Sequence, residues 1–334
     1  MKFRKKRPVA ATASGAYNRA AGWPRSMEKA LRNRLTFGPL MLGGLFLLLW
    51  LDHAAERWTR EPFARATHNP NRAGIQGLGL LVLLILLLPL ATRELAVLFT
   101  AEKVRPYRII AALGSGALAL HAFLTQFEWF SVIAASTLAF IVVFVMIAAA
   151  LRRAWSRQAH DAIVSMAGTV LATLYLGGLG WFLMALRVKH SAHFTGSTML
   201  ILTILVVVKS TDIGAYFGGR AFGRHKLIPW LSPGKTWEGL ACGVLFSGMI
   251  GALFAPHIPH IHPAWWEGFI LGVVIGGVGQ AGDLLESLMK RDAEVKDSGQ
   301  VVPGFGGILD IIDSPLLAAP FAYLLFSFFT HSQP

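Results

Sequence analysis

The segment "SLMKRDAEVKDSGQVVPGFGGILDIIDSPLL", residues 287–317, joins a charged, glycine-rich turn to a strongly apolar run. It carries Asp310 and Asp313 into a stretch that otherwise has the composition of a membrane helix. A carboxylate at membrane depth is costly, so it is a functional candidate by default. The segment therefore indicates a membrane helix that begins beside a polar loop with a chemical role.

Composition extends this interpretation to the whole chain. Of the 334 residues, 54% are hydrophobic and 15% are charged, whereas a soluble protein carries about 25% charged residues. The mean hydropathy is +0.54. Most of the apolar segments approach the roughly 20 residues that cross a bilayer. The sequence thus predicts an all-α integral membrane protein with about nine transmembrane helices, near residues 37–51, 74–91, 109–126, 131–151, 162–186, 194–208, 238–256, 264–282 and 308–329.

The distribution of cations predicts the topology. With a cytoplasmic N-terminus and nine spans, 25 of the 31 Lys and Arg residues fall on the cytoplasmic side. Such an excess marks cytoplasmic loops, so it explains the net charge of +13 without a nucleic-acid partner. We expect a multi-pass protein of a bacterial inner membrane. Its expected parts are a basic, disordered cytoplasmic arm (1–35), N-terminal transmembrane helices (36–190) and a C-terminal catalytic region (191–334) with its site on the cytoplasmic side.

Acidic residues are concentrated in the C-terminal region, where ten of the 18 lie from Asp212 onward. Asp283, Glu286 and Lys290 are spaced to share one helix face, and Asp310 and Asp313 share another. Two acidic faces at the ends of neighbouring spans could converge on Mg²⁺, which prefers carboxylates, waters and substrate phosphates. A transporter could use similar acids for Na⁺ or H⁺, and pairs that only pack helices together are the third interpretation.

Basic and glycine-rich segments favour the metal-phosphate interpretation. "SPGKTWEG" places Lys235 beside a Pro-Gly turn, and "KRDAEVKD" supplies Lys290, Arg291 and Lys296. "PGFGG" supplies glycines whose backbone N–H groups can approach an anion closely. Cations beside glycine turns and carboxylates suit a metal-bound polyphosphate. The sixth apolar segment is short and ends at Lys209–Asp212, so we expect a broken helix that lines a cavity there.

The segment from Ser287 resembles the signature of the phosphatidate cytidylyltransferases, also called CDP-diacylglycerol synthases. The positions that follow the family pattern are Ser287, Lys290, Arg291, Lys296, Asp297, Gly306, Gly307, Asp310 and Asp313. Three further blocks, "DIGAYFGGRAFGRHKL", "SPGKTWEG" and "GDLLES", are similar to family blocks and occur in the family's order. The resemblance covers about residues 209–315 and agrees with a multi-span helical fold.

The resemblance implies transfer of CMP from CTP to phosphatidate, giving CDP-diacylglycerol and pyrophosphate. It implies Mg²⁺ as cofactor, with a second cation left open, and CTP, phosphatidate and membrane lipids as partners; a homodimer is also left open. The expected metal ligands are Asp283, Glu286, Asp310 and Asp313, and the expected catalytic residues are Asp283, Asp310, Asp313, Lys290 and Lys296. The expected substrate-binding residues are Asp212, Ser232, Lys235, Thr236, Glu238, Arg291, Asp297, Gly306 and Gly307.

Three positions depart from the family pattern. Phe305 stands where the family has His, Ile311 where it has Arg, and Gly234 where it usually has Lys. These changes leave open a different lipid-phosphate substrate or a relative that has lost catalysis. The alternative from another class is an ion-coupled secondary transporter, which predicts symmetry between the two halves. No internal repeat is evident in the sequence.

Overall fold

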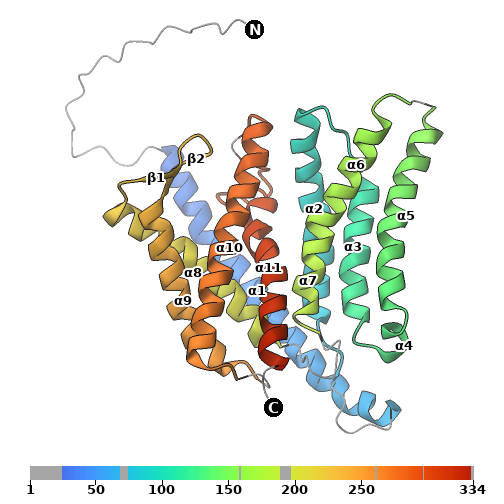
Figure 1. Ribbon diagram of the computed structural model, residues 1–334, viewed down its shortest axis with the longest axis horizontal. Helices are drawn as coiled ribbons and strands as arrows, with labels where there is room; N and C mark the ends of the chain where they lie inside the picture. Colours follow the sequence, from blue (N-terminus) through green and yellow to red (C-terminus); the bar gives the residue numbers. More distant parts are fainter. Residues whose placement is uncertain are drawn as a thin grey trace, which may run out of the picture.

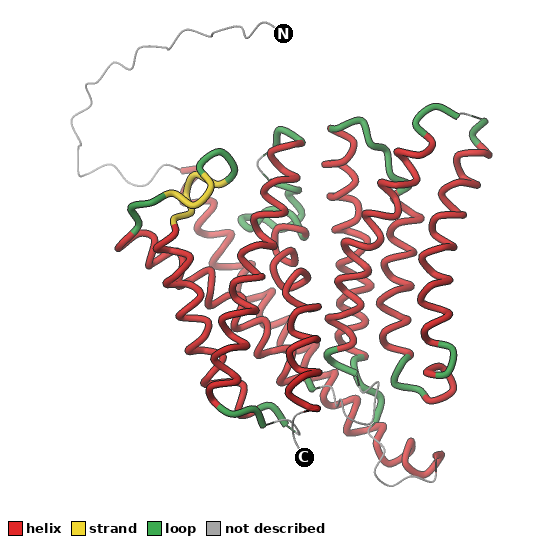
Figure 2. The backbone as a smooth tube through the Cα atoms, viewed as in Figure 1, coloured by secondary structure: helices red, strands yellow, loops and turns green. Residues whose placement is uncertain are grey.

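The computed structural model describes residues 25–67, 74–157, 159–188, 197–259, 262–295 and 297–331, which are helical apart from one β-hairpin and the connecting loops (Figure 2). The helices are α1 (Arg25–Thr67), α2 (Leu78–Ala101), α3 (Arg108–Leu124), α4 (Glu128–Ser131), α5 (Ala134–Trp155), α6 (Ala162–Thr173), α7 (Leu179–Ala185), α8 (Thr198–Phe222), α9 (Trp237–Phe254), α10 (Trp265–Asp292) and α11 (Leu309–His331). The hairpin pairs β1 (Lys226–Ile228) antiparallel with β2 (Ser232–Thr236), and two short helical turns are η1 (Leu174–Gly178) and η2 (Ala255–His257).

The predicted apolar segments are helices, and the protein is an all-α, multi-pass membrane protein. Among the described residues, eight helical stretches are long and apolar enough to cross a bilayer, and α3, with 17 residues, is a shorter apolar helix. Helices α6 and α7 form one such stretch through η1, from Ala162 to Ala185. Successive long helices run in alternating directions between the two ends of the bundle (Figure 1). We call the end that carries β1 and β2 the hairpin end.

Helix α1 is much longer than the apolar segment that marks it in the sequence. Its 43 residues correspond to about 65 Å of helix, roughly twice the thickness of the bilayer's hydrocarbon core. It begins at Arg25, inside the segment expected to be an arm, whereas residues 1–24 lie outside the described residues. In Figure 1 it runs obliquely from the hairpin end to the opposite end.

The remaining long helices form two groups (Figure 1). Helices α2, α3, α5, α6 and α7 pack together, and α8, α9, α10 and α11 form the second group. Helix α11 contacts both α10 and α7 and so joins the groups. In the second group, α9 and α10 approach closely at small residues: a Cβ on Gly251 would lie 2.9 Å from the Cα of Gly272. Such close approach is typical of helix pairs in membranes and gives the site a rigid frame.

The prediction of a broken sixth helix is wrong. Helix α8 continues without interruption from Thr198 to Phe222 and includes Lys209 and Asp212. The helix has no need to break there, because Asp212 has side-chain partners and remains partly exposed. The irregular backbone lies elsewhere: η1 is a π-helical turn at which Gly177 meets the backbone of Ser115 on α3.

Candidate active site

The candidate residues of the C-terminal region lie at the hairpin end of the second helix group (Figure 1). Asp283, Glu286 and Lys290 lie on the last turns of α10, and Asp310 and Asp313 lie on the first turns of α11. The two helices run in opposite directions and pack together. The end of one and the start of the other therefore bring both acidic faces to one place.

Three of these carboxylates form a cluster, which we call the carboxylate cluster: Asp283, Glu286 and Asp313. Each offers one oxygen atom, and these atoms lie within 4.8 Å of one another. Glu286 is 1% exposed and Asp313 is 2% exposed. Glu286 Oε1 and Asp313 Oδ2 are buried and have no hydrogen-bond partner among the described residues. Buried carboxylates need an opposite charge nearby, so these oxygens fit the ligand set of a divalent cation.

Lys290 connects this cluster to Asp310. Its Nζ atom donates to Glu286 Oε2 at 3.0 Å and to Asp310 Oδ1 at 2.8 Å. Asp310 Oδ2 also accepts a hydrogen bond from the backbone N–H of Gly307 at 2.7 Å. Asp310 thus lies beside the carboxylate cluster with both oxygens engaged, and its role as a metal ligand stays a prediction.

A second polar chain runs from the cluster to α8. Lys235 Nζ lies 2.5 Å from Asp283 Oδ2 and donates to Gln280 Oε1 at 2.9 Å. Gln280 in turn donates to Asp212 Oδ1 at 2.7 Å. Gln280 was not among the predicted residues, although it precedes Asp283 by three positions and so shares its helix face. The chain holds Lys235 of β2 over the cluster.

A cavity of about 420 Å³ opens along this chain between α8, α9, α10 and the hairpin. Its walls combine charged and apolar side chains, as a site for a nucleotide or lipid headgroup would require. The lining residues are Asp212, Ala215, Tyr216, Leu227, Gly234, Lys235, Thr236, Gly239, Leu240, Gln280 and Asp283. Of the predicted substrate-binding residues, Asp212, Lys235 and Thr236 thus lie at the cavity.

Several predicted substrate-binding residues hold the hairpin in place. Thr236 Oγ1 accepts the backbone N–H of Gly239 at 3.1 Å and caps α9. Glu238 Oε1 lies 2.6 Å from His225 Nδ1 and accepts from the His225 backbone. Arg291 Nε donates to the carbonyl oxygen of Leu231 at 3.2 Å. These contacts fix the strand that carries Lys235.

The other predicted residues have varied surroundings. Ser232 begins β2 and is partly buried, whereas Asp297 is exposed. Gly306 has a φ of 102°, which favours glycine, and a Cβ there would lie 2.6 Å from Asp310 Oδ2. Lys296 lies outside the described residues.

Glu94 on α2 was not among the predicted site residues, although its carboxylate reaches the site. It is 5% exposed and accepts the backbone N–H groups of Ile308 at 3.0 Å and Leu309 at 2.8 Å. It also accepts a hydrogen bond from Ser298 Oγ at 3.3 Å. Glu94 therefore caps the N-terminus of α11 from the other helix group. The signal was present, because Glu94 and the neighbouring Arg93 are the charged residues of a helix that is largely apolar.

The loop before α11 also contacts α1. Arg34 Nε donates to the carbonyl oxygen of Gly304 at 2.9 Å. Phe305, which departs from the family pattern, places its ring against α1, since a Cβ on Gly38 would lie 3.2 Å from Phe305 Cζ. The Phe305 side chain is 42% exposed, so its ring lies beside α1 without being enclosed.

Comparison with known proteins places these residues in a recognised family. A profile described as the cytidylyltransferase family matches residues 74–329. The chain is 42% identical to a phosphatidate cytidylyltransferase of Haemophilus influenzae over 150 residues, which are 43% of this chain and 50% of that protein. It is 36% identical to an Escherichia coli protein called uncharacterized protein YnbB over 149 residues, 42% of this chain and 49% of that protein.

A third relative is a phosphatidate cytidylyltransferase of Bacillus subtilis. It is 38% identical over 164 residues, which are 48% of this chain and 58% of that protein. The chain thus spans about half the length of the curated relatives it matches. The family profile extends further and covers the carboxylate cluster, the hairpin and Glu94.

Proposed function

The chain belongs to the cytidylyltransferase family, and from that premise we propose that it transfers CMP from CTP to phosphatidate. The products are CDP-diacylglycerol and pyrophosphate. The observation that carries the proposal is the carboxylate cluster with its two unpartnered buried oxygens, next to Lys235 and Lys290. One chain supplies all of these residues, so the proposal needs no second copy.

The reaction requires no activated side-chain nucleophile. An oxygen of the phosphatidate phosphate attacks the α-phosphorus of CTP, a new P–O bond forms, and the bond to the β-phosphate oxygen breaks as pyrophosphate leaves. Both reactants are anions, so the main task of the protein is electrostatic. Lys235 and Lys290 supply positive charge beside the cluster, and the cavity along α8 and α9 would hold the nucleotide.

The carboxylate cluster would hold Mg²⁺ through Asp283, Glu286 and Asp313. When bound, the ion would neutralise negative charge on the phosphates. Asp310 and Gly307 would orient Lys290 from the opposite side, through the hydrogen bonds at 2.8 Å and 2.7 Å. Lys235 meanwhile keeps Asp283 paired and lies at the cavity wall.

A direct assay tests the proposal. The full chain in detergent is incubated with labelled CTP, phosphatidate and Mg²⁺, beside Asp313→Asn and the control Glu267→Gln, which changes an acid at the opposite end of α10. We expect label to appear in lipid with the unaltered chain and the control, and to be lost in Asp313→Asn. Absence of transfer from folded protein would overturn the proposal.

The same assay distinguishes the lipid substrate. Parallel reactions contain a polyprenyl phosphate in place of phosphatidate. If label were transferred only to the polyprenyl phosphate, that lipid and not phosphatidate would be the substrate, and the reaction would still be a CMP transfer. An ion-coupled transporter receives no support from the family match, which names a nucleotidyl transfer. A bacterial inner membrane with the hairpin end in the cytoplasm, where CTP is available, is part of the proposal.

A further inference from the structure

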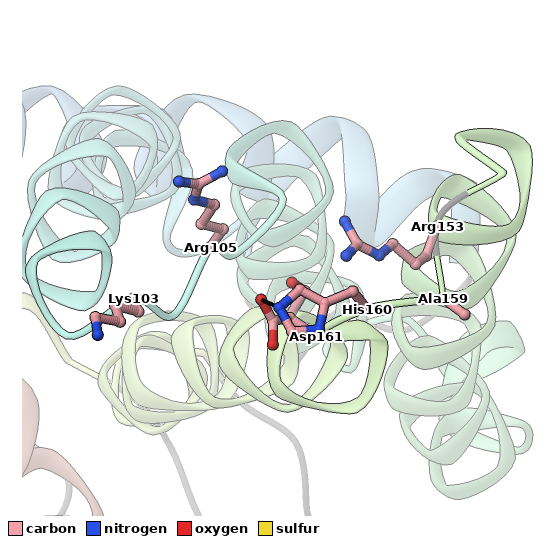
Figure 3. A pocket seen from close by; sticks show the side chains of 7 residues that line it. Lys103, Arg105, Arg153, Ala159, His160 and Asp161 are labelled. Carbon is pink, nitrogen blue, oxygen red and sulfur yellow. Dashed lines mark ion pairs between the residues drawn. The ribbon is translucent and has the colours of Figure 1, made fainter.

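A second cavity, of about 380 Å³, lies at the hairpin end of the other helix group (Figure 3). Its walls come from the turn between α2 and α3, the end of α5 and the start of α6. The lining residues are Lys103, Arg105, Arg153, Ala159, His160, Asp161 and Ser165. None of them lines the active-site cavity, so this basic cavity is a separate feature.

The basic cavity has more positive groups than its own carboxylate can neutralise. Lys103, Arg105 and Arg153 are basic side chains, and among the described residues none of them has a carboxylate within ion-pairing distance. Asp161 Oδ2 is already 3.1 Å from His160 Nε2. Figure 3 shows Arg105 and Arg153 on either side of this His–Asp pair. The surplus of charge suits an anionic ligand.

A hydrogen-bond donor without a partner also indicates an anionic ligand. Arg153 Nε is buried and has no hydrogen-bond partner among the described residues. Helix α6 starts at the cavity wall, and its N-cap residue Asp161 makes no side-chain cap. The Ala162 N–H donates to the carbonyl oxygen of Ala159 at 3.3 Å, and the positive end of the helix dipole favours an anion nearby. Cations that only set topology would need neither a cavity nor an arginine whose Nε atom is buried without a partner.

Two large apolar side chains beside the cavity are exposed. Trp155 on α5 is 87% exposed and Ile163 on α6 is 81% exposed, each two residues from a cavity-lining position. In a membrane these side chains face lipid, so the cavity lies near the boundary between acyl chains and headgroups. A lipid phosphate could enter it while its chains remain along α5 and α6, which a free phosphate cannot do.

We propose that the basic cavity binds the phosphate group of an anionic membrane lipid, independently of the active site. Free phosphate shares the charge but lacks the apolar chains. The proposal does not rest on the proposed enzymatic activity. The probe is phosphatidylglycerol, whose phosphodiester would not serve as the nucleophile of that reaction.

The test uses the full chain in detergent and measures bound lipid by native mass spectrometry. We expect phosphatidylglycerol, and not phosphatidylcholine or inorganic phosphate, to bind and to raise the thermal midpoint. Arg105→Gln with Arg153→Gln should weaken binding at least tenfold. Arg152→Gln, which removes a neighbouring charge outside the cavity, should change it less than twofold.

Four outcomes would overturn the proposal. If Arg152→Gln weakened lipid binding as much as the double variant, the lipid would be held by diffuse attraction to the basic surface. If inorganic phosphate bound as well as phosphatidylglycerol, the ligand would be free phosphate and not a lipid. Loss of binding in the active-site variant Asp313→Asn would place the lipid at the carboxylate cluster. Should the double variant fail to fold, Arg105→Gln alone changes an exposed side chain and should still weaken binding severalfold; unchanged binding would contradict the proposal.

Discussion

Glu94 and Leu309 are 215 positions apart in the sequence, yet the Glu94 carboxylate accepts the backbone N–H of Leu309 at 2.8 Å. This hydrogen bond joins α2 of one helix group to the first residue of α11 in the other. The next turns of α11 carry Asp310 and Asp313. The position of the two aspartates therefore depends on a residue from the N-terminal half of the chain.

We expect Glu94→Gln to lower both stability and CMP transfer. The amide keeps one acceptor oxygen but turns an NH₂ group toward N–H donors, so buried donors lose their partner, at a cost of about 1–3 kcal/mol. Because α11 then shifts relative to α10, the maximal rate should fall by at least tenfold while the KM for CTP changes little. Thermal unfolding and steady-state kinetics in detergent measure both effects.

The matched control is Glu102→Gln, at the exposed end of the same helix. It should leave both measurements unchanged. Glu94→Asp keeps the charge on a shorter side chain and should recover part of the rate. A Glu94→Gln protein with normal rate and stability would show that the cap does not position α11.

Removal of divalent cations should destabilise the protein through the carboxylate cluster. Ligand at a hundred times its Kd stabilises the folded state by about 2.7 kcal/mol, so chelation should lower the thermal midpoint by several degrees. Asp313→Asn replaces one of the three clustered carboxylates with a neutral amide and should abolish this difference. Unfolding curves with Mg²⁺ and with chelator, measured without substrate, test the site apart from activity.

Asp310→Asn tests in the same measurement whether Asp310 belongs to the metal site or only supports the carboxylate cluster. Its partners are Lys290 and Gly307, so we expect a lower midpoint overall with the Mg²⁺ effect retained. Loss of the Mg²⁺ effect in Asp310→Asn would instead make Asp310 a ligand. A midpoint of the unaltered chain that is insensitive to Mg²⁺ would contradict metal binding at the cluster.

The sequence could predict the spans and the acidic residues because both depend on local patterns. Apolar length identifies a span, and i, i+3 spacing puts Asp283 and Glu286 on one face whatever the partners are. Local patterns mark Glu94 and Gln280 as candidates, but their partners on α11 and α8 depend on the packing of distant helices, which no local spacing encodes. The expected break in α8 failed for a related reason: the partners of Asp212 on α10 are invisible from its own segment.

A buried ion-pair group at the end opposite the hairpin should control stability without affecting catalysis. Arg187 is fully buried and binds Asp52, which is also fully buried, and Glu56 at 2.9 Å. Arg187→Gln would leave the Asp52 carboxylate in the interior without its cation, which typically costs about 3–5 kcal/mol. We expect a large fall in the thermal midpoint, with normal transfer by the protein that remains folded at low temperature.

Arg57→Gln provides the comparison, since Arg57 lies on α1 beside Asp52 and Glu56 and is exposed. It should unfold like the unaltered chain. A second variant, Arg187→Gln with Asp52→Asn, removes both buried charges and should recover part of the loss. If Arg187→Gln alone leaves the midpoint unchanged, the ion pairs do not hold α1 against the bundle.

Gly234→Lys should strengthen CTP binding, because it adds a cation at the wall of the active-site cavity. Gly234 lines the active-site cavity, and a Cβ there has no heavy atom within 4 Å, so a longer side chain can be accommodated. One added cation near a phosphate in a partly exposed site contributes about 0.5–1 kcal/mol, which lowers the KM two- to fivefold.

Gly234→Gln adds similar length without charge and should leave the KM unchanged. The advantage of Lys over Gln should shrink at high salt, and an equal KM for both variants at low salt would mean that the phosphates of CTP do not lie beside Gly234 of β2.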